Sequence, residues 1–197
     1  MADHLLKRFQ LGGVGCVLAL VAAIAAIPAA FTGGSIVASA LGLVGAVLIL
    51  LGVFALKERF QSPLFSIGAT FIIVGAVASL AAAALLLSAL DSMGPGMMTG
   101  SPADMQRALG ASAGALVALG FLALLALVGW ILIGVGLVTT RQQIGQALGP
   151  GQDGFVMATG ILVIIPLIQL VGLILLAIVF FKLAKGVAPA ASAPPAA

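Results

Sequence analysis

Residues 9–56 read FQLGGVGCVLALVAAIAAIPAAFTGGSIVASALGLVGAVLILLGVFAL, a run of 48 residues that contains no Lys, Arg, Asp, Glu or His. A membrane-spanning helix needs about 20 apolar residues, so this run is long enough for two. The run has one cluster of turn-forming residues, Pro28 with Thr32, Gly33 and Gly34. Glycine and proline favour a reversal of the chain there. The run therefore predicts a hairpin of two transmembrane helices.

Three more runs lack charge, at residues 60–90, 108–140 and 154–181. Only 7% of the chain is charged and 63% is hydrophobic, whereas about a quarter of a soluble domain is charged. We expect an all-α integral membrane bundle of about five transmembrane helices within residues 11–182. The predicted spans are residues 11–31, 35–56, 64–90, 108–140 and 155–181. A short amphipathic cytoplasmic start (residues 1–10) precedes the bundle and an Ala/Pro-rich tail (residues 183–197) follows it.

The few cations indicate which end of the bundle faces the cytoplasm. Five crossings place Lys7, Arg8, Lys57, Arg59 and Arg141 on one side, and Arg107, Lys182 and Lys185 on the other. Cytoplasmic loops carry the excess of Lys and Arg, so we predict a multi-pass protein of the cell membrane with a cytoplasmic N-terminus. Lys182 and Lys185 do not fit this orientation. A sixth crossing, or a re-entrant break at Pro166, would return them to the cytoplasmic side.

The composition excludes several classes of function. The predicted spans contain no titratable group other than Cys16, which we interpret as a small packing residue, and no catalytic motif is present. We therefore expect no enzyme, no cofactor and no resident metal. The net charge of +3 arises from scattered cations, which argues against a nucleic-acid surface, because phosphate binding needs clustered ones.

Small residues are the most abundant signal, and they mark places where helices can pack closely in lipid. The chain has 26 glycines, and several stand at helical spacing. The predicted packing residues are Gly110 and Gly114, Ala38 and Gly42, and Gly68 and Gly75. Such residues can join helices of one chain or of two, so we expect the lipid bilayer and either other membrane subunits or a homo-oligomer as partners.

Two polar features suggest alternative functions. Gln169 follows Pro166 by one turn, and a broken helix with a nearby amide can line a path for a solute. This arrangement suggests a passive channel or a small-solute carrier. The loop at residues 91–107 holds Met93, Met97, Met98 and Met105, and thioethers are soft ligands that suit Cu(I). The loop therefore suggests Cu(I) handling, although no Cys or His accompanies the methionines.

Residues 43–54 (LVGAVLILLGVF) and 170–181 (LVGLILLAIVFF) are similar, with Gly45 aligned with Gly172. Five crossings would run these two segments in opposite directions, as in an inverted repeat. The alternative is a chance similarity between two strings of Leu, Val, Ile and Gly.

Three segments carry a family resemblance: FQLGGVGCVLALVAAI at 9–24, ALGLVGAVLILLGVFALKERF at 40–60 and GILVIIPLIQLVGLILLAIVFFKLAKG at 160–186. They resemble the small, Gly- and Leu-rich polytopic membrane proteins of archaea and bacteria whose function is unknown. The resemblance implies a prokaryotic polytopic membrane protein and no chemistry. The hypothesis that follows is a non-catalytic structural or accessory subunit of a larger membrane complex.

Overall fold

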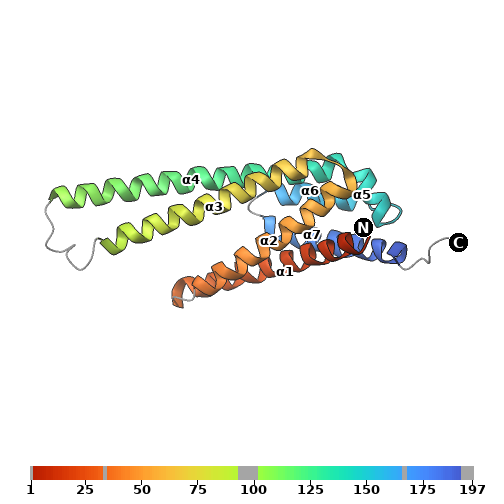
Figure 1. Cartoon of the computed structure of the whole chain (residues 1–197), viewed down its shortest axis with the longest axis horizontal. Coiled ribbons are helices and arrows are strands. Elements are labelled where there is room, and N and C mark those ends of the chain that lie inside the picture. Colours follow the sequence, from red (N-terminus) through yellow and green to blue (C-terminus); the bar gives the residue numbers. More distant parts are fainter. Residues whose placement is uncertain (1, 33–34, 93–101, 166–167, 192–197) are drawn as a thin grey trace. The chain divides into compact units, whose positions relative to one another are not determined.

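A computed structural model describes residues 2–32, 35–92, 102–165 and 168–191 of the chain, and every regular element in these ranges is a helix. The helices, in chain order, are α1 (Ala2–Thr32), α2 (Ser35–Phe60), α3 (Pro63–Ser92), α4 (Pro102–Thr139), α5 (Arg141–Leu148), α6 (Asp153–Ile164) and α7 (Gln169–Ala191) (Figure 1). The all-α prediction is confirmed.

Four helical segments within the described residues are long and apolar enough to cross a membrane. They are Asp3–Ala25 in α1, Ala40–Phe60 in α2, Gly120–Thr139 in α4 and Gln169–Val187 in α7. Two further apolar segments are shorter, Asp153–Ile164 in α6 and Pro63–Ala78 in α3, a helix that continues to Ser92. These segments support a helical membrane protein, while the predicted number of about five spans is not confirmed.

The predicted helix over residues 155–181 is wrong, because the structure has two helices there, α6 and α7. Ile165 follows α6 with φ −89° and ψ 110°, an extended conformation. It precedes a proline, whose ring disfavours the helical conformation in the residue before it. The proline therefore ends α6, where we expected a continuous helix.

Two segments expected to be irregular are helical. Arg141–Leu148, which lies between the predicted spans 108–140 and 155–181, forms α5, which ends before Gly149 at φ 125°. Glycine adopts a positive φ without a steric clash, because it has no Cβ. α7 continues to Ala191, into the stretch expected to be a tail from residue 183. Alanine has the highest helix propensity, so an Ala-rich end extends a helix readily.

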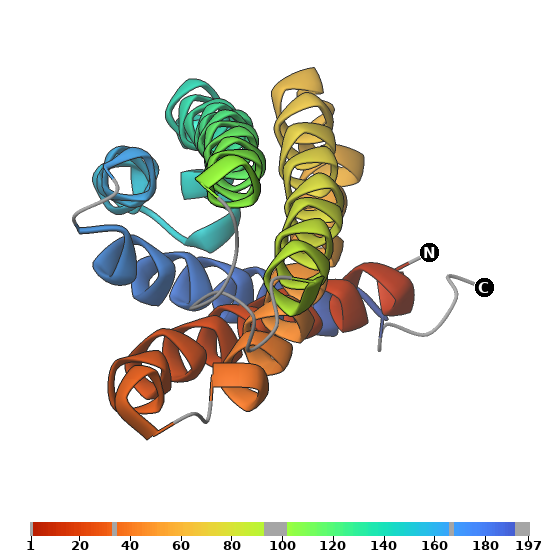
Figure 2. The ribbon, with the colours of Figure 1, turned by 90° about the vertical axis from the view of Figure 1, so that its left-hand side faces the viewer.

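The chain divides into two compact units, and the first consists of Met1–Ala69 with Trp130–Ala197. In this unit α1 and α2 run antiparallel, since Arg8 at the start of α1 forms an ion pair with Glu58 at the end of α2 (Figure 2). α7 also runs antiparallel to α1, since Leu6 near the start of α1 shares a groove with Lys185, whereas Leu20 shares one with Leu173. The largest fully buried side chains of this unit include Phe9, Phe65 and Phe180.

Because α2 and α7 both run antiparallel to α1, they run in the same direction. The similar segments at 43–54 and 170–181 are therefore parallel, and the predicted inverted arrangement is wrong. The splitting of the last predicted span accounts for the error, because it adds one reversal of the chain between α4 and α7.

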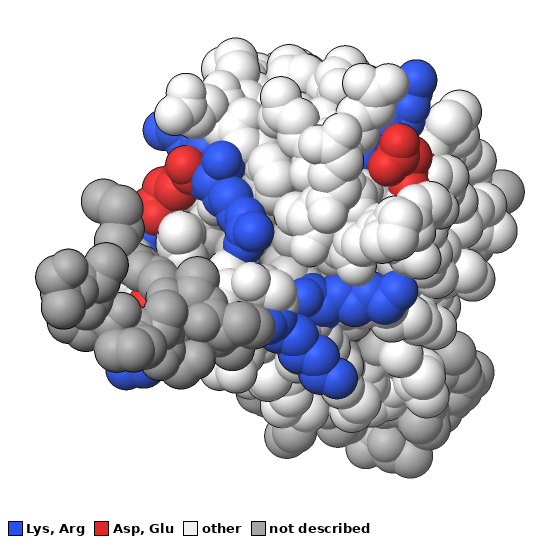
Figure 3. Space-filling view, turned by 90° about the vertical axis from the view of Figure 1, so that its right-hand side faces the viewer, with Lys and Arg blue, Asp and Glu red and all other residues white. Residues whose placement is uncertain are grey.

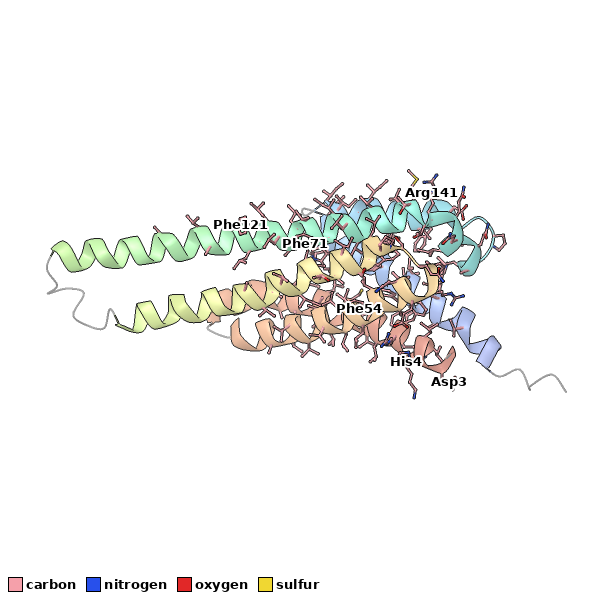
Figure 4. The ribbon with its side chains drawn as sticks, turned by 45° about the horizontal axis from the view of Figure 1, so that its top comes forward. Asp3, His4, Phe54, Phe71, Phe121 and Arg141 are labelled. Carbon is pink, nitrogen blue, oxygen red and sulfur yellow. The ribbon has the colours of Figure 1, made fainter. Side chains whose placement is uncertain are left out.

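The second unit is Thr70–Gly129, which contains most of α3 and α4. The two helices pack closely around Gly75, where an added Cβ would lie 3.2 Å from the backbone nitrogen of Ala126. Phe121 of α4 is 62% exposed, and Figure 4 shows its side chain on the helix. A large exposed apolar side chain fits a lipid environment.

Candidate functional site

A glycine-lined interface joins α1 and α2 in the first unit. A Cβ added to Gly12 would lie 2.7 Å from the Cα of Gly52, and one added to Gly15 would lie 2.6 Å from the backbone nitrogen of Ile49. At Gly45 the nearest atom would be the backbone nitrogen of Ala19, at 2.8 Å. No side chain fits at these positions, so the two backbones are in direct contact.

α7 joins this interface through aromatic rings. A Cβ on Gly52 would lie 2.8 Å from Cζ of Phe180, and one on Gly12 would lie 3.2 Å from the same ring. The ring of Phe180 also lies beside that of Phe9, with 6.3 Å between the centroids and 30° between the planes. The ring of Phe180 therefore packs against Gly12, Gly52 and the ring of Phe9. This contact is typical of tight packing between three helices, here α1, α2 and α7.

The predicted packing residues have different surroundings. An added Cβ on Gly42 would meet the Cβ of Ala22 at 3.7 Å, and one on Gly75 would meet α4 as described above. Gly68 is buried, and the side chain of Ala38 lies outside the described part of the chain. A Cβ added at Gly110 or Gly114 would meet no described atom within 4 Å. An interface at these two glycines stays a prediction.

A second glycine contact holds α4, α6 and α7 together, and the sequence analysis did not single it out. A Cβ added to Gly134 would lie 2.6 Å from the carbonyl oxygen of Gly160, and one on Gly160 would lie 2.7 Å from that of Gly134. Gly172 of α7 would meet the backbone nitrogen of Val163 at 2.7 Å. Among 26 glycines, spacing alone gives too weak a signal to select these three.

Two threonine hydroxyls of the first unit bond to the backbone carbonyl four residues earlier in the chain. Thr159 is fully buried, and its Oγ1 donates to the carbonyl oxygen of Phe155 at 2.8 Å. The Oγ1 of Thr140 donates to the carbonyl oxygen of Gly136 at 2.6 Å. Within the described residues, every buried side-chain nitrogen or oxygen has a hydrogen-bond partner. Each of these two hydroxyls donates its proton to the backbone and therefore has none to donate to a solute.

The proposed channel site is only partly covered by the structure. Gln169 is the first residue of α7 and is half-buried, while Pro166 lies outside the described residues. The backbone N–H of Ile168 donates to the carbonyl oxygen of Ile165 at 3.2 Å, so the chain turns between α6 and α7. The helix break that the sequence suggested is present, and a solute path through it stays a prediction.

The Met-rich loop lies mostly outside the described residues, which exclude Met93, Met97 and Met98. The backbone of Met105 belongs to α4, while its side chain is outside the described part. Cu(I) binding by this loop therefore stays a prediction. In the ranges that the structure covers, His, Cys, Asp and Glu form no group of three that could hold a metal ion.

Cations gather at one end of the first unit, where α1 begins and α2 and α7 end (Figure 3). The Lys and Arg residues whose side chains are described are Lys7, Arg8, Lys57, Arg59, Arg141, Lys182 and Lys185. Figure 4 labels Asp3, His4 and Arg141 at this end.

Two of these cations contradict the predicted sidedness. Lys185 shares a groove with Leu6 and Gln10 of α1. The Nζ of Lys182 donates to Oε1 of Gln152 at 3.0 Å and lies 5.3 Å from the ring centroid of Phe155. The five-crossing arrangement, which puts Lys182 and Lys185 opposite Lys7 and Arg8, is therefore wrong. The break between α6 and α7 returns the chain to the end at which α1 begins, in line with the alternative of a break at Pro166.

Comparisons of this chain with protein-family models, with curated proteins and with solved structures found no significant match.

Proposed function

We propose that this chain is a non-catalytic integral membrane protein that serves as a structural or accessory subunit of a larger membrane complex. The observation that carries the proposal is the direct backbone contact of α1 with α2, sealed by Phe180 of α7. Such an interior leaves no room for a solute between these helices. It suits a rigid element that presents its outer faces to neighbours in the membrane.

Those outer faces are apolar. Val14, Val17 and Val21 of α1 are each more than two-fifths exposed, and so are Leu43, Val44 and Val47 of α2. On α4, Val117 and Phe121 are 73% and 62% exposed. In a bilayer these side chains contact either lipid or another subunit. Both environments are apolar, so neither contact carries a free-energy penalty.

The cluster of cations supports a cytoplasmic location for the end of the first unit that holds Lys7 and Lys185. Cytoplasmic segments beside transmembrane helices carry the excess of Lys and Arg. Seven of the chain's eight Lys and Arg residues have described side chains, and all seven belong to this end. We therefore infer that the start of α1 and the end of α7 both face the cytoplasm.

The proposal is tested by purifying the tagged full-length chain from native membranes in a mild detergent, followed by mass spectrometry of the co-purifying proteins. We expect one or more partners in stoichiometric amount. The matched variants replace one exposed face at a time: Leu43, Val44 and Val47 of α2 by Ala, or Val117, Phe121 and Leu124 of α4 by Ala. At least one face should lose the partner while the chain itself still accumulates. Recovery of the chain alone from several detergents would contradict the proposal.

A further inference from the structure

Two adjoining grooves run along the seam between α1 and α7 in the first unit. The first groove has a volume of about 390 Å³. Its floor consists of the buried residues Cys16, Leu173 and Ala177, and its walls include the exposed residues Val17 and Ile174. The second, of about 360 Å³, is lined by Leu6, Gln10, Phe181, Ala184 and Lys185. Phe181 lines both, and a Cβ added to Gly13 of α1 would lie 2.8 Å from its ring, so the two grooves meet at this ring. We term the pair the α1/α7 groove.

The length of the α1/α7 groove matches one leaflet of a bilayer. It extends along α1 from Leu20 to Leu6, which at 1.5 Å per residue is roughly 21 Å. Half of a hydrocarbon core of about 30 Å, together with one headgroup region, gives about 20–22 Å. A lipid molecule of a single leaflet is therefore long enough to lie along the whole groove.

The two ends of the groove differ in chemistry. The part near Cys16 is lined by no polar surface, whereas the part near Lys185 includes Gln10 and the lysine ammonium. Within the described residues no carboxylate pairs with Lys185, since their single ion pair joins Arg8 to Glu58. Lys185 therefore gives this end a positive charge.

We propose that the α1/α7 groove is a binding site for one anionic phospholipid of the leaflet at the cationic end. An acyl chain lies against Leu173, Ile174 and Ala177, and the phosphate lies at Lys185. A helix of another subunit, about 10–12 Å wide with its side chains, is a poorer fit. The groove follows a seam in which α1 and α7 already touch, with an added Cβ on Gly13 only 2.8 Å from the Phe181 ring. A phospholipid supplies both the thin apolar chain and the negative charge.

The test uses the full-length chain in detergent with added dioleoylphosphatidylglycerol or dioleoylphosphatidylcholine, and counts retained lipids by native mass spectrometry. We expect one phosphatidylglycerol to be retained in preference to phosphatidylcholine. A lysine near anionic lipid contributes about a fivefold increase in binding, so Lys185→Gln should weaken retention about fivefold. The matched control is Lys57→Gln, an exposed lysine of α2 outside the groove.

A second pair of variants tests the apolar part. Ile174→Trp should fill the groove and reduce retention, while Val47→Trp, on an exposed face of α2, should leave it unchanged. Both positions are exposed, so the fold should tolerate the larger ring, and thermal unfolding midpoints check this. Equal retention of the two lipids, an equal loss in Lys57→Gln, or no loss in Ile174→Trp would each overturn the proposal. So would a dimer of the chain that Ile174→Trp dissociates, since a second copy would then occupy the groove.

Discussion

Gly12 and Gly52 face each other across α1 and α2 so closely that a Cβ on either would lie within 2.8 Å of the other residue's Cα. Lipid tails are as apolar as the helix surfaces, so helices in a membrane gain little from burying apolar side chains. Close backbone packing must supply the association instead. The stability of the first unit therefore depends on positions where a side chain is absent.

Gly12→Ala should destabilise the protein, because its methyl group meets the backbone at Gly52, which cannot give way as a flexible side chain does. Overpacking of this kind costs about 1–3 kcal/mol. The matched control is Gly114→Ala, where a Cβ would meet no described atom within 4 Å and where helix propensity favours alanine by up to about 1 kcal/mol. Thermal unfolding in detergent measures both. Equal midpoints for the two variants would contradict the interpretation of Gly12 as a contact residue.

Phe180→Ala should also destabilise the protein, because it leaves a cavity where the ring packs against Phe9, Gly12 and Gly52. In soluble proteins such a truncation costs about 3–5 kcal/mol. We expect a smaller loss here, since the separated helices keep their apolar surfaces in lipid. Denaturant titration in mixed micelles gives the value. The neighbouring Phe181→Ala is the control for aromatic size, because Phe181 is 38% exposed and should cost less.

The hairpin of α1 and α2 was predictable because its signals agree. An uncharged run of the right length surrounds one cluster of turn formers, and the cations Arg8 and Lys57 flank the run. The division into α6 and α7 was harder to predict. Proline occurs within many membrane helices, where neighbouring groups satisfy the freed backbone atoms. Only the extended conformation of Ile165 reveals that this proline follows a helix end.

The packing site was only partly predictable for a related reason. Gly45 and Gly52 recur at a seven-residue step in α2, which indicates a packing face. Their partners on α1 are spaced differently, at Gly12 and Gly15, and the contact also needs the ring of Phe180 from the far end of the sequence. Spacing within one helix cannot name the partner helix. The direction of α7, and with it the position of Lys185, follows from the break before Gln169, which the sequence offered only as an alternative to a continuous helix.

Arg8 and Glu58 should contribute little to stability individually, because their side chains remain 27% and 45% exposed. Pairs of this kind contribute about 0.2–1 kcal/mol. A double-mutant cycle with Arg8→Gln and Glu58→Gln isolates the interaction from the effect of each change alone. The exchanged pair, Arg8→Glu with Glu58→Arg, should recover most of the loss. Failure of the exchange to recover any of it would mean that contacts of the individual side chains, rather than the pair, are responsible.

The common end of α1 and α7 predicts a labelling pattern. In a Cys16→Ala background, single cysteines at His4, Gln61 and Lys185 should all react with a membrane-impermeant maleimide only after the cells are permeabilised. All three residues are exposed in the structure. The parent chain is the control, because Cys16 is 1% exposed and should remain unlabelled. If the Lys185 cysteine were labelled in intact cells and the His4 cysteine were not, the start of α1 and the end of α7 would lie on opposite sides of the membrane. That result would contradict the prediction.

Gln169→Leu distinguishes the structural role from the solute path. A passive channel that used the break before α7 would depend on this amide, since the hydroxyl of Thr159 in the preceding helix α6 donates to its own helix. A structural subunit should tolerate leucine, which is similar in size and well suited to lipid. We therefore expect Gln169→Leu to leave both the permeability of reconstituted vesicles to small polar solutes and the unfolding midpoint unchanged, with empty vesicles as the baseline. Solute uptake that the wild-type chain supports and Gln169→Leu removes would contradict the structural role and favour the channel.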